Sequence, residues 1–392
     1  MKNMNEDIFD NFIRLKRGYD LPENIHLGNY PVVASTSIKD YHIAYKVEPP
    51  CVVTGRSGSL GTIQFIAKKC WPLNTTLYVK DFRGNLPKFV YYFLQTMHLE
   101  NFNSGAGVPT LNQNHLHKLK ITFPPLPIQK KIAAVLTAYD DLIENNNSRI
   151  TILEKMAEEI YREWFVRMRF PGHEKTKFHK GVPEGWEIEK VKSLGKVITG
   201  KTPPTNILKY YNGNYLFIKT PDMHNNSFVF ETEETLTGDG IKSQISQTIP
   251  ENSICVSCIG TGGIVSITTS TCQTNQQINS VVLKNEAYLE WAFFTLRNLK
   301  ETIKLFGTTG TTMTNLSKGK FEKIKILKPK DDFIKKYHFI VEPLFNRAKI
   351  LYLKSIKLKQ SRDLLLSRLI SGKLSMEELD IKFPPSMEER DA

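Results

Sequence analysis

The sequence predicts an α+β fold in which two strand-rich globular domains are separated by two long antiparallel helices. The helices form a coiled-coil spacer, and the whole chain is a pseudo-two-fold internal repeat. Three observations support this fold class. Two long stretches carry the apolar spacing of a coiled coil, strand-and-turn composition precedes each of them, and short motifs recur in the same order about 200 residues apart.

The first long helix is predicted to follow the proline-rich stretch 124–127 and to continue to Phe165 without a helix breaker. Its narrow apolar stripe repeats in steps of three and four, as in a coiled-coil seam that faces another long helix. The seam residues are Ile128, Ile132, Val135, Tyr139, Leu142, Ile150, Leu153, Ala157, Ile160 and Trp164. About forty helical residues span roughly 60 Å. Polar Asn146 lies where the seam shifts by four residues, and a buried Asn146 would fix the register of the pair.

The same spacing returns from Asp331 to Leu369, so we expect the two helices to pack antiparallel. The second seam consists of Ile334, Tyr337, Val341, Leu344, Ala348, Leu351, Ser355, Leu358, Arg362, Leu365 and Leu369. Pro343 removes one backbone donor inside this helix, and we expect a kink near it.

Segments with aromatic and β-branched residues between Gly, Pro and Asn precede each helix and read as short strands. One helix is expected inside the first segment, at residues 88–99. The stretch 167–184 lacks apolar periodicity and is interpreted as a linker. The predicted organisation is a first globular domain at 1–124, the first long helix at 125–166, the linker at 167–184, a second globular domain at 185–328, the second long helix at 329–374 and a tail at 375–392.

The internal repeat is visible as four matched motifs. Arg17-Gly18 corresponds to Thr199-Gly200, Gly28-Asn29-Tyr30 to Gly213-Asn214-Tyr215, Gly58-Ser59-Leu60-Gly61 to Gly260-Thr261-Gly262-Gly263, and Lys118-Leu119-Lys120-Ile121 to Lys323-Ile324-Lys325-Ile326. With antiparallel helices, two such domains suit a nucleic-acid duplex read at two separated half-sites. The first half shows no counterpart to residues 186–195. We therefore expect its lead-in strand to be missing, or replaced by the tail after Ser375.

The bulk composition narrows the class of partner. The balance of 53 Lys and Arg against 40 Asp and Glu gives a net charge of +13, which favours a polyanion such as nucleic acid, although a solvated Lys-rich surface would give the same balance. Five sparse cysteines indicate a reducing compartment without a disulfide framework. The polar start and the lack of a 20-residue apolar run argue against a secretory signal and a membrane span. We expect a cytoplasmic protein.

Three motifs point to chemistry that their context disfavours. Residues 195–202 fit the P-loop expression, but the two prolines that follow make the required helix unlikely to form. Cys255 and Cys258 form a lone CxxC, and in a strand they would point to opposite faces. The stretch 123–126 lacks the polar residue and the aromatic of an adenine methyltransferase motif. We predict no catalytic residue, no metal and no cofactor in this chain.

The ordered motifs together resemble the specificity (S) subunit of type I restriction-modification systems. The resemblance covers the whole chain and rests on Val53-Thr54-Gly55-Arg56-Ser57-Gly58-Ser59-Leu60-Gly61, Trp71-Pro72-Leu73-Asn74-Thr75-Thr76-Leu77-Tyr78, Pro124-Pro125-Leu126-Pro127-Ile128-Gln129, Pro183-Glu184-Gly185-Trp186-Glu187, Gly200-Lys201-Thr202-Pro203 and Leu369-Ile370-Ser371-Gly372-Lys373-Leu374. It implies two target-recognition domains that each read one half of a bipartite double-stranded DNA site. It also implies a helical spacer that binds two methyltransferase (M) subunits, with restriction (R) subunits completing a complex that cuts unmodified DNA. S-adenosylmethionine, Mg and ATP would belong to those partners.

Candidate DNA-binding residues follow from loop position, small size and charge. The paired glycine turns let the backbone approach DNA, and Arg56, which we align with Ile259, would contact a base edge or a phosphate. A glycine-stabilised turn with a solvated Arg56 is the alternative. The candidates are Arg56, Ser57, Gly58, Ser59, Lys39, His42, Lys68, Lys201, Lys219, Lys242, Gly260 and Thr261. Because the two halves share little beyond scaffold motifs, we expect an asymmetric target with unlike halves.

Apolar residues off the helix seam are the candidate subunit interface. These residues are Leu136, Ile143, Met156, Tyr161 and Phe165. If these apolar residues are exposed, partner subunits would cover them, as expected for a specificity subunit. The alternative is a stand-alone DNA-binding regulator or architectural protein that bridges two sites. A third reading, a P-loop ATPase, depends on nucleotide binding.

Overall fold

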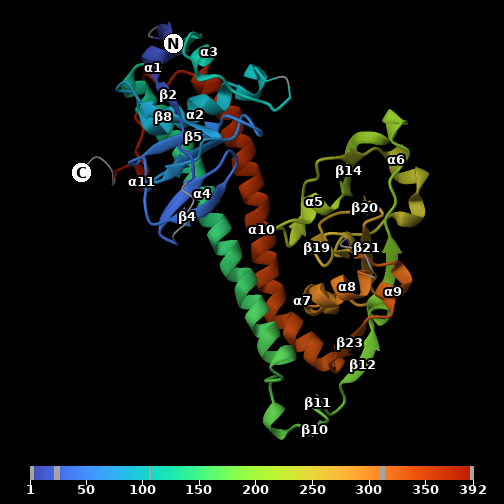
Figure 1. The fold of residues 1–392 in the computed structure, drawn as a ribbon. Helices are drawn as coiled ribbons and strands as arrows, with labels where there is room; N and C mark the ends of the chain where they lie inside the picture. Colours follow the sequence, from blue (N-terminus) through green and yellow to red (C-terminus); the bar gives the residue numbers. More distant parts are fainter. Residues whose placement is uncertain (1–3, 22–26, 106, 309–313, 389–392) are drawn as a thin grey trace. The chain divides into compact units, whose positions relative to one another are not determined.

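The computed structural model describes residues 4–21, 27–105, 107–308 and 314–388. The chain divides into two compact units (Figure 1). The first unit comprises Met1–Asn145 and Ser355–Ala392, and the second comprises Asn146–Lys354. Each unit contains a strand-rich domain and a part of both long helices, so the α+β fold class predicted from the sequence is confirmed.

The strand-rich domain of the first unit contains two sheets. A four-stranded antiparallel sheet has the order β2 (Arg14–Arg17), β8 (Thr76–Asp81), β5 (Cys51–Gly55) and β6 (Ile63–Ile66). A three-stranded sheet has the order β4 (Ile38–His42), β3 (Tyr30–Val33) and β7 (Trp71–Pro72). The central strand β5 is buried along its whole length, and α2 (Pro87–Thr96) buries Phe89, Val90 and Phe93 in the same domain.

The second domain repeats this topology. A sheet of order β13 (Gly195–Thr199), β21 (Ile278–Leu283), β17 (Ile254–Ser257), β19 (Val265–Thr268) and β15 (Phe228–Val229) corresponds to the four-stranded sheet. A sheet of order β16 (Thr235–Leu236), β14 (Tyr211–Ile218) and β20 (Cys272–Thr274) corresponds to the three-stranded one. The helices α7 (Leu289–Asn298), α8 (Lys300–Gly307) and α9 (Lys318–Glu322) follow in chain order. The internal repeat is therefore a repeat of topology as well as of motifs.

The expectation that the first domain lacks its lead-in strand is wrong. Strand β1 (Asn5–Ile8) pairs antiparallel with β9 (Lys120–Phe123), just as β12 (Glu187–Lys190) pairs with β23 (Lys325–Lys328) in the second unit. A short helix follows each lead-in strand, α1 (Phe9–Phe12) and η4 (Val191–Leu194). All four residues of β1 are exposed, so the strand has no apolar alternation that a sequence pattern could detect.

The long helices are α4 (Leu126–Tyr161), which ends in a π turn at Arg162–Val166, and α10 (Asp331–Ile370). Within the second unit, Tyr337 donates to the Ala157 carbonyl over 3.0 Å and Tyr352 to Glu154 over 3.2 Å, so the helices run antiparallel there. Within the first unit, Arg362 contacts Asp140 at 2.6 Å. Pro343 lies inside α10.

Local contacts explain where the helices begin. Pro124 and Pro125 end β9, and the buried side chain of Gln129 donates to the Pro124 carbonyl over 2.9 Å. The α10 helix starts at Asp331, whose carboxylate accepts from Lys328 and from Tyr288, each over 2.7 Å. An acidic residue in the first turn also complements the positive end of the helix dipole.

The segments next to the long helices are held by buried apolar side chains, of which Phe170 and Met376 are the most buried. In the stretch 167–184, Phe170 is buried against Trp186 and Phe333, ahead of the short β10 (Phe178–His179) and β11 (Val182–Pro183) pair. In the tail, Met376 is buried in the first core and Lys131 of α4 donates to its carbonyl over 3.2 Å. The tail therefore packs on α4 and does not replace the lead-in strand. Among the described residues, no helix is long and apolar enough to cross a membrane.

Candidate nucleic-acid interface

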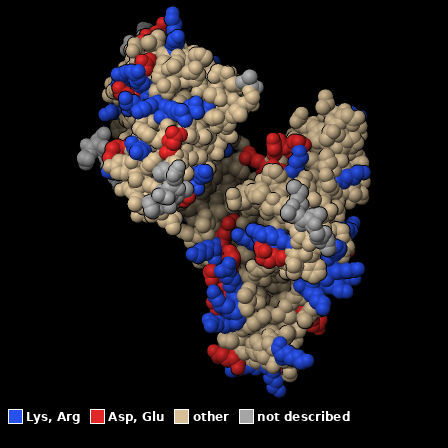
Figure 2. Space-filling view, in the orientation of Figure 1, with Lys and Arg blue, Asp and Glu red and all other residues tan. Residues whose placement is uncertain are grey.

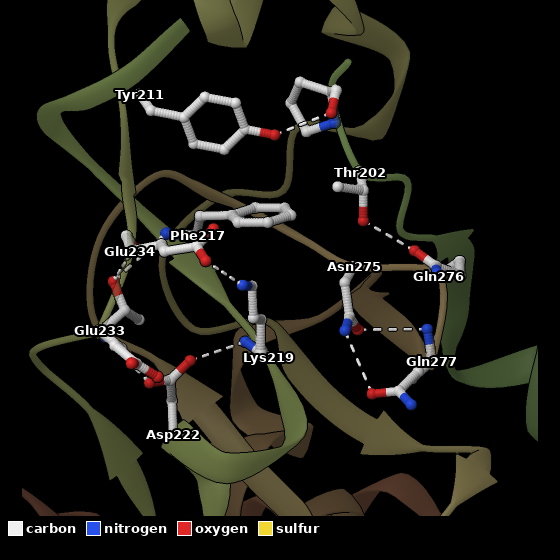
Figure 3. A network of polar contacts seen from close by, with 12 residues as sticks. Thr202, Tyr211, Phe217, Lys219, Asp222, Glu233, Glu234, Asn275, Gln276 and Gln277 are labelled. Atoms are coloured by element: carbon white, nitrogen blue, oxygen red, sulfur yellow. Dashed lines mark hydrogen bonds and ion pairs between the residues drawn. The ribbon is translucent and has the colours of Figure 1, made fainter. Parts of the chain in front are cut away.

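In the second domain, four loops meet beside the ends of strands β13, β14, β17 and β20. Lys201 donates its backbone N–H to Thr274, and Thr202 donates its hydroxyl to the Gln276 side chain over 2.7 Å. Thr220, after β14, donates to the Gln277 side chain over 3.2 Å (Figure 3 shows the neighbouring residues). The Gly260 turn lies against the same loop, since a Cβ there would be 3.8 Å from the Gln277 amide nitrogen.

The first domain builds the matching loops from different side chains. The Ser35 hydroxyl donates to the carbonyls of Ser57 and Thr75, over 3.2 and 3.0 Å. Arg56 donates its Nε–H to the Asn74 carbonyl over 3.0 Å, and the Asn74 amide donates to the Asp20 carboxylate. The same backbone scaffold therefore carries a different polar surface in each domain.

The two glycine turns share one backbone conformation. Gly58 and Gly61 have φ of 86° and 87°, and Gly260 and Gly263 have φ of 76° and 84°, a region that L side chains rarely adopt. Among the described residues nothing lies within 4 Å of where a Cβ on Gly58 would be, so the turn is open on that side. A backbone exposed in this way can approach a phosphate closely.

Backbone hydrogen bonds correct our alignment of Arg56 with Ile259. The Arg56 N–H donates to Thr75 and its carbonyl accepts from Leu111. Cys258 makes the same pair of bonds, with Gln277 and Leu316, so Arg56 corresponds to Cys258. Cys258 is buried whereas Arg56 is half-buried, so the two turns still present unlike side chains.

The structure brings several predicted DNA-binding residues to these loops. The second-domain loops contain or adjoin Lys201, Lys219, Gly260 and Thr261. The Gln244 side chain donates to the backbone carbonyl of Lys201, and exposed Lys242 lies two residues before Gln244. Lys219 already forms an ion pair with Glu234. Arg56, Ser57, Gly58 and Ser59 form the first-domain turn.

Three predicted residues lie elsewhere in the first domain. Lys39 on β4 and Lys68 after β6 are exposed. His42 is only 5% exposed, and its ring packs against Trp71 at 5.2 Å between centroids. His42 accepts the Ala44 N–H over 2.9 Å, which places it in the interior and argues against a DNA contact. Its position at the end of a short strand made it look exposed in the sequence.

Sequence reasoning missed Ser35, Asn74, Thr220, Gln276 and Gln277. Asn74 and Gln276 occupy equivalent positions, because Leu73 donates to Val33 as Asn275 donates to Ile218. For Asn74, Gln276 and Gln277 the signal was polarity immediately before strand β8 or β21, which selection by loop position, small size and charge does not detect. Lys and Arg lie in several patches among Asp and Glu in the view of Figure 2, so charge alone marks no single groove on that face.

The predicted subunit interface is partly wrong. Leu136 is fully buried in the core of the first unit, and Tyr161 and Phe165 are 6% and 7% exposed in the core of the second. Tyr161 and Phe165 pack against Tyr337 of α10 as well as against Phe294 and Trp186, so they belong to the packing of the second unit and not to a free face. Ile143 is half-buried and Met156 is 49% exposed. Leu142, which we placed in the seam, is 54% exposed.

The remaining motifs have structural explanations. Residues 195–199 form β13, and the described chain from Gly200 to Ile207 contains no helix whose amides could hold a phosphate. Cys255 and Cys258 point into different cores, as expected for a strand. Burial raises the pKa of Cys255 to about 12 and that of Cys258 to about 11, so both thiols are neutral near pH 7 and poor metal ligands.

Comparisons with known proteins identify both halves of the chain. The model of the type I restriction modification DNA specificity domain matches residues 5–155 and 183–336. The chain is 28% identical to the HindI specificity subunit of Haemophilus influenzae, over 74% of this chain and 78% of that one. It is also 28% identical to the MjaIX specificity subunit of Methanocaldococcus jannaschii, over 82% and 77% of the two chains.

A solved structure shares the fold. The S subunit of a type I restriction-modification system from M. genitalium superposes with a TM-score of 0.60 at 16% identity, covering 97% of both chains. Two matched specificity domains, the repeated topology and the two long helices agree with one another. The chain therefore belongs to the family of type I restriction-modification DNA specificity subunits.

Proposed function

We propose that each strand-rich domain reads one half of an asymmetric, bipartite double-stranded DNA site in the cytoplasm, with target-recognition domains at 1–124 and 185–328. The observation that carries this proposal is the repeat of one sheet topology whose equivalent loops present different side chains. Where the first domain has Arg56 and Thr75, the second has Cys258 and Gln277. A shared scaffold supports the same mode of docking, and unlike side chains support unlike base preferences.

The chain itself supplies binding and no chemistry in this proposal. Its candidate site consists of amides, hydroxyls, Lys and Arg, which suit hydrogen bonds to bases and phosphates. Methylation and cleavage belong to two M subunits and to R subunits that join through the complex. S-adenosylmethionine, Mg and ATP would bind to those partners.

The docking surface for M subunits is proposed from apolar side chains that the long helices leave exposed. On α10 these are Phe339, 83% exposed, with Ile340 and Ile350, 43% and 46% exposed. On α4, Met156 and Ile143 keep the role assigned from the sequence. Apolar side chains exposed on a helix face are typical of a surface that a partner covers.

The docking proposal is tested by copurification with a co-expressed M subunit. Phe339→Asp is expected to weaken copurification at least about tenfold, because burying an unpaired carboxylate in an interface is strongly unfavourable. Leu305→Asp on α8 is the matched control, since Leu305 is 74% exposed and lies on a different helix. Equal loss in both variants would contradict a specific surface on α10.

The main test is a methylation map. The full chain is co-expressed with the M subunit encoded beside it, and methylated adenines are mapped across the host genome. We expect one bipartite motif with two unlike halves. A palindromic motif would refute two domains with different base preferences. If neither methylation nor a stable complex with the M subunit is found, a stand-alone DNA-binding protein is favoured.

A further inference from the structure

The loop that enters β8 in the first domain and β21 in the second carries two side-chain amides in a fixed orientation. Asn74 is half-buried, Gln276 is exposed and Gln277 is half-buried. The loop rests on the glycine turn in both domains, because Thr75 and Gln277 accept the N–H groups of Arg56 and Cys258 over 2.8 and 2.7 Å. A duplex whose backbone approached the turn would thus meet this loop.

The orientation of the Gln277 amide follows from its partners. The backbone N–H of Gln277 can only donate, and it donates to the Asn275 side chain over 3.1 Å, so that atom of Asn275 is the oxygen. The other atom is then the NH2 group, which donates to Gln277 over 3.2 Å (Figure 3). The atom of Gln277 that accepts this bond and the Thr220 hydroxyl must be Oε1.

The Gln277 NH2 group is therefore left as a donor on a half-buried side chain. Among the described residues it has no hydrogen-bond partner, and in Figure 3 no dashed line reaches it. The NH2 group lies beside the Gly260 turn, where glycine places no side chain against it; a Cβ there would be in ordinary contact at 3.8 Å. Lys219, one residue before Thr220, is engaged by Glu234 and does not occupy this position.

The first domain presents the opposite character. The Asn74 NH2 group donates to the Asp20 carboxylate, which cannot donate in return when ionised. The Asn74 side-chain oxygen is therefore left as an acceptor. At the matching place in the second domain, Thr202 replaces Asp20 as the partner of Gln276.

We propose that Gln277 and Asn74 are specificity-determining residues of opposite hydrogen-bonding character, one donor and one acceptor. This inference rests on the proposed function. In the major groove, guanine presents acceptors at O6 and N7, thymine at O4 and adenine at N7, whereas cytosine and adenine present amino donors. Gln277 disfavours cytosine, the base without a major-groove acceptor, at one position of its half-site, and Asn74 selects cytosine or adenine in the other. Asn275, Thr220 and Asp20 are positioning residues that fix the two amides.

The decisive variant is Gln277→Glu in the full chain, co-expressed with the same M subunit and assayed by methylation mapping. The substitution keeps an oxygen for Asn275 and Thr220, replaces the NH2 group by an acceptor and adds a negative charge. At one position of one half-site, cytosine is expected to become accepted, and guanine and thymine to be disfavoured, by about tenfold or more. The other half-site is an internal control for folding and assembly, and must keep its sequence.

Two further variants complete the test. Gln277→Ala removes the donor without adding charge, so base preference at that position of the methylation motif should be lost. This variant provides the test if Gln277→Glu gives no methylation. Asp20→Asn frees the Asn74 amide to turn over and should broaden one position of the opposite half-site only. An unchanged motif in Gln277→Glu or in Gln277→Ala overturns the inference while leaving the proposed function intact. The absence of a bipartite motif in the wild-type complex instead refutes the proposed function.

Discussion

The ion pair of Arg362 with Asp140 is expected to hold α10 against α4 in the first unit. Its Nη1 and Oδ1 atoms are 2.6 Å apart, and Tyr92 of α2 donates to the second carboxylate oxygen over 2.6 Å. The two side chains are 18% and 22% exposed. A fully buried pair loses about 3–5 kcal/mol when one partner is removed, and an exposed pair about 0–1 kcal/mol. For this partly exposed pair we expect Arg362→Met to cost about 2–3 kcal/mol.

Such a loss should lower Tm by about 4–12 °C, given about 2–4 °C per kcal/mol for a unit of this size. Hydrogen exchange resolved by peptide gives the sharper measurement, because α2 and the first half of α4 should lose protection while β17 and β21 keep it. The matched control is Arg162→Met, whose ion pair with Glu158 at 2.7 Å is 46% exposed on the Arg side. A loss below about 0.5 kcal/mol for Arg362→Met, or equal losses in both variants, would refute the reasoning.

Three further predictions concern single side chains. Gln129→Ala should cost about 3 kcal/mol in urea unfolding, because a buried amide with several hydrogen bonds leaves buried backbone groups without partners. Burial raises the pKa of Glu290, although a hydrogen bond with His338 acts in the opposite direction. The protonated carboxyl therefore stabilises the fold below about pH 4, and this contribution is lost as the pH rises. The Tm of Glu290→Gln should increase relative to that of wild type from pH 4 to 8, and a constant difference would contradict this. Gly263→Ala should destabilise more than the roughly 1–2 kcal/mol expected for Gly58→Ala, because its Cβ would lie 2.7 Å from a backbone atom whereas Gly58 faces open space.

The long helices were predictable because their apolar spacing is a local property of the sequence. Ile132, Tyr337 and Ala348 are buried as the seam required. What the seam could not show is a second packing surface, since Leu136 is buried by a domain whose residues lie far away in the sequence. The strand β1 escaped prediction for a related reason: both of its faces are exposed, and only its pairing with β9 defines it as a strand.

The candidate site was harder to predict because its chemistry depends on orientation. A sequence shows that Gln277 carries an amide, but whether it offers a donor or an acceptor depends on Asn275 and Thr220 in the folded chain. Selection by loop position, small size and charge found Lys219, which Glu234 engages, and overlooked the side-chain amides of Asn74 and Gln277. Uncharged side-chain amides can discriminate between bases better than lysines can. Lysine binds phosphates whatever the DNA sequence. An amide held in one orientation loses its hydrogen bond when it faces the wrong base, and the buried polar group left without a partner weakens binding. A repeated scaffold can therefore change its half-site by exchanging the residues that hold an amide, without altering the backbone bonds that both domains share.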